Sequence, residues 1–355
     1  MNLAVGYAVS RDDAGIRRLV ASQPMPGRVR ISFCREPDFS LGCAVTGQDV
    51  RILVARTEPD DEVVGVACRS IRRVFINGLE QRIGYLGQLR VHERCRGRWL
   101  VSRGFTLLEE LNRADPVPVY LVSIVNGNRD AIGVLVDKPR KRFPALREVA
   151  QYITYAIRVG KSKGFDRRLE IITHGTVDQL DEIAEFLRAE GCRRQLSSVW
   201  SVDALRELEG LGLALDDLRI ARRNGRIVGV LALWDQSAYK QPVIRGYTGW
   251  LKPVAAILPR PGTMLSSVYA ALVAVADDDA TVFGTLLREI YNLASLRGYE
   301  YLLVGLDSRD PLNDAVRPYR HIAYPSRLYL ASWSSGGSRH EPLDTRPVYV
   351  DIATL

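Results

Sequence analysis

The chain has 355 residues, of which 46% are hydrophobic and 25% are charged, a composition typical of a folded globular protein. A single hydrophobic core stops growing near ~250–300 residues, so this length favours two domains. The formal net charge is +8, but many arginines cluster between residues 82 and 103, which favours a small anionic ligand over nucleic acid as a partner.

Other features argue against several protein classes. The longest largely apolar stretch, 264–276, is shorter than the ~18–20 residues of a membrane helix. The N-terminal segment lacks the basic region of a signal peptide. The five cysteines are scattered without CxxC spacing, which argues against a disulfide framework and a zinc site. We therefore expect a cytoplasmic protein that uses no metal and binds no membrane.

The two halves of the chain resemble each other. Residues 52–71 and 218–235 each suggest a strand, a polar turn and a second strand, and the Asn224-Gly225 turn is a strong hairpin signal. A strand and a helix precede each hairpin, and a helix, a buried strand, a polar turn and a last strand follow it. The corresponding segments are 7–22 and 169–190, 105–132 and 286–312, and 152–159 and 327–333, with a further strand expected at Val348–Ala353.

Each half thus has the order β-α-β-β-β-α-β-α-β. We expect an α/β protein of the α+β mixed-sheet type, made of two tandem units that are each a twisted mixed sheet flanked by helices. The boundary is expected near 160–166, where Gly, Lys and Ser show no periodicity. Residues 1–160 would form one domain and residues 167–355 the other.

Residues 86–111 combine a strand, an Arg/Gly turn at His92–Trp99 and a helix from about residue 100 to 112. Free backbone N–H groups and the dipole at a helix start attract a phosphate. Gly97 would let the backbone approach the ligand closely, and arginines can bind it in bidentate fashion. The arginines of this turn are Arg94, Arg96 and Arg98. The segment therefore predicts a pyrophosphate site.

LRVHERCRGRW resembles motif A of the GNAT superfamily of acyl-CoA-dependent N-acyltransferases, (R/Q)-x-x-G-x-(G/A). Arg94 and Gly97 match the first two fixed positions, whereas Trp99 stands where the family has Gly or Ala. Asn128 begins a stretch similar to the family's N-x-x-A, whose Asn helps to hold pantetheine. Leu135 occupies the place of a tyrosine that often serves there as general acid. The resemblance covers residues 1–160.

The resemblance implies acetyl-CoA as acyl donor and an amine as acceptor. It also implies that the backbone of residues 89–91 polarises the thioester carbonyl. The implied donor-binding residues are Leu89, Arg90, Val91, Arg94, Arg96, Gly97, Arg98, Trp99, Leu100 and Asn128.

The second half differs at the corresponding turn. Asp277, Asp278 and Asp279 precede its helix at 281–297, where the first half has arginines. Carboxylates repel a pyrophosphate, so we interpret this half as a degenerate unit without CoA. It would shape the acceptor cleft or stabilise the first unit.

Acyl transfer needs a deprotonated amine, a polarised carbonyl and a proton for the leaving thiolate. Strand alternation over 79–91 places Tyr85, Gly87, Leu89 and Val91 on one face and Glu80 and Arg90 on the other. Tyr85 is the candidate acid or substrate contact. Glu80 is the candidate base, although it also fits a solvated turn residue. His92, Tyr152 and Tyr155 are alternatives.

We therefore expect an N-acetyltransferase that transfers acetyl directly to an unidentified primary amine. Two alternatives stay open: a non-catalytic CoA-binding regulatory module, and a transferase of similar tandem fold that uses aminoacyl-tRNA. The sequence determines neither the acceptor nor the oligomeric state.

Overall fold

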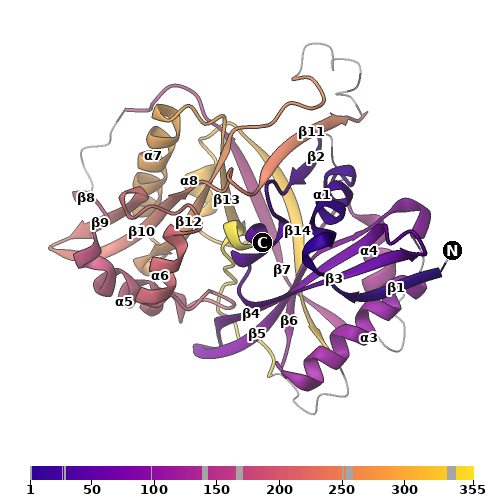
Figure 1. Cartoon of the computed structure of the whole chain (residues 1–355). Coiled ribbons are helices and arrows are strands. Elements are labelled where there is room, and N and C mark those ends of the chain that lie inside the picture. Colours follow the sequence, from indigo (N-terminus) through magenta and orange to yellow (C-terminus); the bar gives the residue numbers. More distant parts are fainter. Residues whose placement is uncertain are drawn as a thin grey trace.

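A computed structural model describes residues 2–25, 27, 29–96, 98–137, 143–164, 171–249, 252, 259–333 and 341–355. A twisted sheet of twelve strands runs through both halves of the chain, in the order β1-β3-β4-β5-β6-β14-β7-β13-β12-β10-β9-β8, with helices on its faces (Figure 1). The sheet is mixed, because β5–β6 and β12–β13 pair in parallel and the other strands pair antiparallel. The expected fold class is thus confirmed.

The elements of the first half are β1 (Asn2–Tyr7), α1 (Asp13–Ser22), β2 (Val29–Cys34), α2 (Phe39–Ala44), β3 (Gln48–Glu58), β4 (Val63–Ile76), β5 (Leu79–Val91), α3 (Arg98–Ala114), β6 (Tyr120–Val125), α4 (Arg129–Ile132) and β7 (Ala145–Arg158). Those of the second half are β8 (Ile171–His174), α5 (Leu180–Gly191), α6 (Val202–Glu209), β9 (Leu218–Arg223), β10 (Arg226–Trp234), β11 (Gln241–Tyr247), β12 (Ser267–Val275), α7 (Ala280–Leu296), β13 (Tyr301–Asp307), α8 (Asn313–Val316) and β14 (His321–Ser332).

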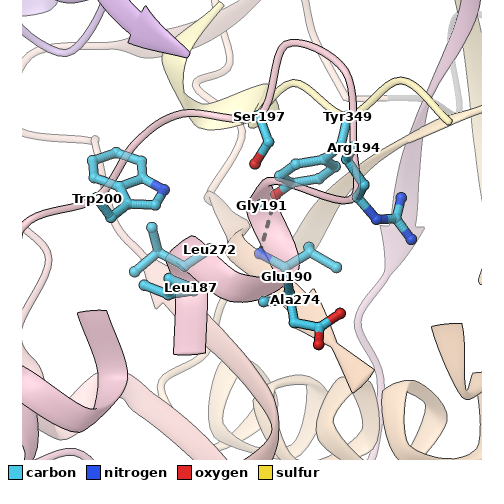
Figure 2. A pocket seen from close by; sticks show the side chains of 10 residues that line it. Leu187, Glu190, Gly191, Arg194, Ser197, Trp200, Leu272, Ala274 and Tyr349 are labelled. Carbon is cyan, nitrogen blue, oxygen red and sulfur yellow. Dashed lines mark hydrogen bonds between the residues drawn. The ribbon is translucent and has the colours of Figure 1, made fainter. Parts of the chain in front are cut away.

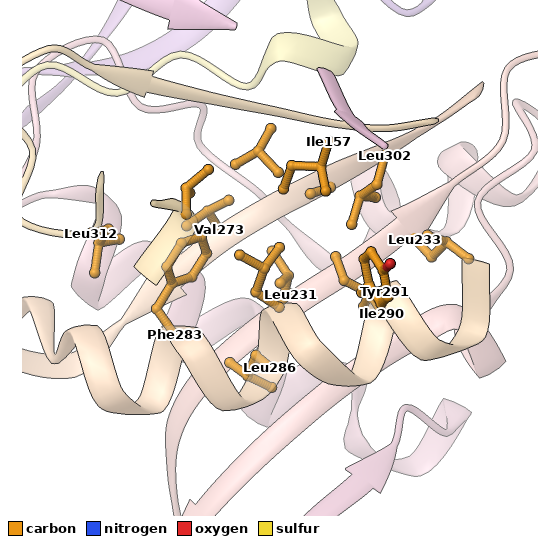
Figure 3. Packing of buried hydrophobic residues seen from close by; sticks show 14 of the residues in the cluster. Ile157, Leu231, Leu233, Val273, Phe283, Leu286, Ile290, Tyr291, Leu302 and Leu312 are labelled. Atoms are coloured by element: carbon orange, nitrogen blue, oxygen red, sulfur yellow. The ribbon is translucent and has the colours of Figure 1, made fainter. Parts of the chain in front are cut away.

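Local sequence signals account for most of these elements. Asn77-Gly78 and Asn224-Gly225 turn with positive φ at both residues, as hairpin turns require. Thr176 and Gln179 form the expected capping box ahead of α5. The apolar face of α7, which includes Phe283, Leu286 and Ile290, is fully buried (Figure 3). This helix covers the second half of the sheet.

The two halves exchange their last strands. β7 ends the first half but pairs with β13 of the second, and β14 ends the second half but pairs with β6 of the first. β7 and β14 also pair with each other, which closes the sheet at its centre. The domain division near 160–166 remains a prediction, and the sheet is continuous across it.

The segment after β14 ends between the two halves, near the centre of the molecule (Figure 1). The strand expected at Val348–Ala353 does not form, so that prediction is wrong. Val348 makes a single bridge to Gln195, and Ile352–Thr354 form a 3-10 helix capped by Asp351. The segment uses side chains instead of a strand ladder to bind its neighbours.

Candidate functional site

In the first half, the two central parallel strands separate at a bulge. β5 pairs with β6 over Gly84–Leu86 and Tyr120–Val122. Beyond these residues β6 continues beside β14, while β5 stays beside β4. Gln88 has φ +56°, and the register with β4 shifts at this point, which defines a β-bulge.

The bulge changes which side chains share a face. Directly opposed residues of antiparallel strands point to the same side of the sheet. The opposed pairs on this side are Ser70–Tyr85, Cys68–Gly87 and Val66–Arg90. Arg90 therefore lies on the face of Tyr85, and Val91, opposite Gly65, lies on the other. The expected alternation is wrong beyond Gln88, because the bulge inserts one residue.

The second half repeats this geometry. β12 and β13 pair over Ser267–Tyr269 and Tyr301–Leu303, and Leu272 has φ +55° at a matching register shift. Leu272 thus corresponds to Gln88. The two sites differ in exposure, however. Leu89 is 38% exposed, whereas its counterpart Val273 is 6% exposed.

The segment near the C-terminus covers the bulge of the second half. The Leu272 N–H donates to Asp351 Oδ2 at 2.7 Å. The Val273 N–H donates to the hydroxyl of Tyr349, a residue labelled in Figure 2, at 3.0 Å. The Tyr152 hydroxyl donates to the Val350 carbonyl. Two N–H groups at the bulge of the second half therefore bind oxygen atoms of the chain itself.

The aspartates of the acidic turn in the second half also bind groups of the protein itself. Asp279 caps α7 by accepting from the N–H groups of Thr281 and Val282 at 2.8 and 3.3 Å. Asp278 and Asp310 both pair with the buried Arg194. Arg194 and Tyr349 line the small cavity drawn in Figure 2. These acids thus stabilise the turn itself.

The arginine turn of the first half is exposed. It forms a 3-10 helix at Glu93–Cys95, and α3 begins at Arg98. Arg94 pairs with Glu62, and Arg96 donates to Asp130 at 3.0 Å and to Gln23 at 3.1 Å. Gly97, the second fixed position of the motif, lies outside the described residues.

Trp99 points into solvent rather than into the fold. It is 44% exposed, and the Arg103 guanidinium lies 5.6 Å from its ring centre. The next residue, Leu100, is buried against Val64 and Ala55, with Val91 packed beside it. In the first turn of α3, Trp99 thus faces solvent and Leu100 faces the core.

Asn128 caps α4, because its side chain accepts from the Ala131 N–H at 3.1 Å. Arg96 reaches the same short helix through Asp130. The structure therefore brings the arginine turn and α4 together, and their joint role in donor binding stays a prediction. Leu135 is buried in the core beside α3.

Tyr85 is buried beside the bulge. The Arg72 guanidinium lies 4.2 Å from its ring centre, and a Cβ on Gly87 would lie 2.9 Å from its hydroxyl. Burial raises the pKa of Tyr85, partly opposed by the charge of Arg72. Glu80 lies near the other end of β5 and pairs with Arg73 and Arg188. The structure does not bring Glu80 together with Tyr85.

A set of basic residues, three of them buried and Arg90 half-buried, was missed by sequence reasoning; we call it the central basic cluster. It comprises Arg35, Arg72, Arg90 and Lys240, and it draws on both halves of the chain. No spacing links these positions in the sequence.

In the described residues, no group of three or more His, Cys, Asp or Glu is placed to hold a metal.

The alternative residues lie apart from one another. His92 accepts weakly from the Arg94 N–H at 3.4 Å, and its side chain is half-buried at the arginine turn. The Tyr155 hydroxyl donates to Asn313 at 2.8 Å, and Tyr152 is bound to Val350.

None of the helices among the described residues is long and apolar enough to cross a membrane.

The architecture is a tandem GNAT fold with exchanged last strands. No protein-family model matches the sequence, and no curated protein does. Solved structures do match. The Saccharomyces cerevisiae N-myristoyltransferase with bound myristoyl-CoA has a TM-score of 0.64 at 10% identity, over 94% of this chain and 79% of that chain.

Two further structures are similar. The GCN5-related N-acetyltransferase from Sphaerobacter thermophilus has a TM-score of 0.58 at 16% identity, over 99% of this chain and 98% of that one. The glucosamine N-acetyltransferase region of a fungal multi-domain β-N-acetylglucosaminidase has a TM-score of 0.62 at 16% identity, over 93% and 38%. At such low sequence identity, the structural similarity shows that the fold is shared.

Proposed function

We propose that the protein is an acyl-CoA-dependent N-acyltransferase, with acetyl-CoA as donor and a primary amine as acceptor. The observation that carries the proposal is the contrast between the two bulges. The bulge of the first half is partly exposed beside an arginine turn, and the bulge of the second half is covered by the chain. The tandem fold is shared with N-acyltransferase structures.

The covered bulge indicates what the exposed one binds. At Leu272 and Val273, backbone N–H groups bind a carboxylate and a hydroxyl oxygen. By correspondence, the N–H groups of Gln88 and Leu89 would bind the thioester carbonyl and stabilise the oxyanion of the tetrahedral intermediate. Leu89 is one of the donor-binding residues expected from the sequence, and we add Gln88 to them.

Tyr85 is the proposed proton donor. The neutral amine nitrogen attacks the thioester carbon, the C–S bond breaks, and the departing thiolate takes the proton of Tyr85. The acylated nitrogen then gives its extra proton to the Tyr85 oxygen, which restores the phenol. Because burial raises its pKa, the Tyr85 phenol keeps the proton that it would donate. Glu80 lies outside this proposal, since its two ion pairs favour a role in joining β5 to α5.

A short acyl group suits the packing near Tyr85. Ile83, Leu121 and Tyr152 are fully buried in one cluster with it. This packing supports acetyl over a long acyl chain. The N-myristoyltransferase of similar fold binds myristoyl-CoA, so a donor series is the direct test.

The test has a binding arm and a turnover arm. Calorimetry with CoA and acetyl-CoA should give one site per chain, and free-thiol release should be measured with acetyl-, octanoyl- and myristoyl-CoA against a panel of amines. Tyr85→Phe should lower kcat while leaving acetyl-CoA affinity unchanged. Absence of CoA binding would overturn the proposal, and two sites per chain would overturn the assignment to the first half.

A further inference from the structure

Arg35 is a buried guanidinium without a hydrogen-bond partner among the described residues. It follows β2, is 3% exposed, and its Nε and Nη1 atoms are unpaired. It packs so closely on α2 that a Cβ on Gly42 would lie 2.5 Å from Nη1. A buried charge without a partner destabilises a fold, which favours a ligand that pairs with it.

The other members of the central basic cluster differ in their partners. Arg72 is satisfied by Thr46 and Thr354. Lys240 donates to the Leu355 oxygen at 3.3 Å. The Arg90 guanidinium donates to the Leu89 carbonyl at 2.9 Å. Arg72 and Lys240 therefore have partners far away in the sequence. Among the described residues, Arg35 has no hydrogen-bond partner, and Arg90 has only the carbonyl of the residue before it.

Charge within the cluster is unbalanced. The carboxylate that acts on Arg72 and Lys240 is Asp351, whose pKa burial raises to about 6. Burial lowers the pKa of Arg90, and the charge of Arg35 lowers it further. Neither Arg35 nor Arg90 forms an ion pair with a described carboxylate. An anion that pairs with the Nε and Nη1 atoms of Arg35 would compensate its buried charge.

Arg35 and Arg90 lie beside the proposed reaction centre. Arg90 shares the face of Tyr85 and Gly87 because of the bulge. Arg35 packs on Gly42 of α2, and the next residue of α2, Cys43, lies in one buried cluster with Cys68 and Val66, the β4 residues opposite Gly87 and Arg90. Arg90 is half-buried, so its side chain can be reached from solvent beside the bulge.

Building on the proposed acyl transfer, we infer that the acceptor amine also carries a carboxylate or phosphate, and that Arg35 and Arg90 bind this anionic group. The planar guanidinium fork suits both oxyanions. An anion held there would orient the amine towards the donor carbonyl at the bulge. An amine without an anionic group would leave the buried charge of Arg35 uncompensated.

The experiment uses matched pairs of amines that differ in the anionic group. γ-Aminobutyrate is paired with 1-aminobutane, and O-phosphoethanolamine with ethanolamine. Binding of each to the full chain is measured by calorimetry, and acetyl transfer is measured separately. The same measurements are made on Arg35→Gln and Arg90→Gln, with the exposed Arg245→Gln as the control for loss of a nearby positive charge.

At least one anionic amine should bind on the order of 30-fold more tightly than its partner, as for a desolvated charge pair. Arg35→Gln and Arg90→Gln should abolish this preference, and Arg245→Gln should keep it. The preferred pair distinguishes carboxylate from phosphate. Unfolding midpoints should show that Arg35→Gln is folded and not destabilised, because the charge it removes is unpaired.

The two proposals fail separately. Equal binding of anionic and neutral amines, or a preference unchanged in Arg35→Gln, would overturn the inferred anion site. If anionic amines bind through Arg35 and no acetyl transfer follows from any donor, the anion site stands and the acyltransferase proposal fails. If neutral amines are acetylated as well as anionic ones, the transferase stands and the anion site fails.

Discussion

The carboxylate of Asp351 accepts a hydrogen bond from the backbone N–H of Leu272 at 2.7 Å, at the bulge of the second half. Leu272 corresponds to Gln88, which has nearly the same positive φ in the first half. One bulge thus binds a side chain of the protein, and we propose that the other binds the substrate. This relationship leads to predictions on stability as well as on binding.

The pH dependence of stability should change in Asp351→Asn. Burial raises the pKa of Asp351 to about 6 from an ordinary value of 3.8. The native state therefore binds this proton more tightly, and the stability it contributes is present below pH 4 and lost as the pH rises through 6. The unfolding free energy of the wild type relative to the variant should fall by about 2 kcal/mol between pH 4 and pH 7.

Urea unfolding of both proteins at several pH values measures this difference. The variant has its own cost at every pH, because its amide supplies one acceptor oxygen for two N–H donors. The comparison therefore depends on how the difference in unfolding free energy changes with pH, and not on its value at any one pH. Parallel profiles for the two proteins would show that Asp351 does not titrate in this range.

Gly305→Ala should loosen the segment that covers the second bulge. A Cβ at this position would lie 2.6 Å from Cβ of Ile352 and 2.8 Å from the ring of Tyr152, both in packed surroundings. Overpacking of this kind destabilises by about 1–3 kcal/mol. Gly104→Ala is the matched control, because nothing lies within 4 Å and an alanine in α3 should stabilise by up to about 1 kcal/mol. Thermal unfolding that moves both variants the same way would contradict this reasoning.

Arg194→Met should destabilise the protein by about 3 kcal/mol, because it leaves the fully buried carboxylate of Asp310 without its partner. Arg193→Met, one residue earlier and 43% exposed, removes ion pairs to Glu190 and Asp277 and should cost less than about 1 kcal/mol. Denaturant unfolding compares the two. CoA affinity should be the same in both, since we assign the donor site to the other half; a loss confined to Arg194→Met would contradict that assignment.

Trp99→Ala should leave CoA affinity within about threefold of the wild type. The indole is exposed and its described contact is the cation–π contact with Arg103, which contributes about 0.5–1 kcal/mol to the helix rather than to a ligand. Leu100→Ala, by contrast, should cost about 2–5 kcal/mol of stability, because Leu100 is buried. Calorimetry with CoA tests the first statement, and a tenfold loss of affinity would show that the indole contacts the ligand.

The sequence by itself determined the repeat, the mixed-sheet fold class and most elements. The Asn-Gly turns, the capping box and the apolar face of α7 are local signals, and each acts through neighbours in the chain. The arginine turn followed by α3 was also readable, since its spacing is local. The acidic counterpart in the second half was found in the same way.

Three features were decided by tertiary structure. The exchange of β7 and β14 depends on which edge each strand meets, and two similar halves offer similar edges. The bulge at Gln88 moves Arg90 to the face of Tyr85, because one inserted residue reverses a two-residue alternation. Arg35 and Lys240 are about 200 residues apart in the sequence, and folding brings them together because Cys34 pairs with Gln241 across β2 and β11.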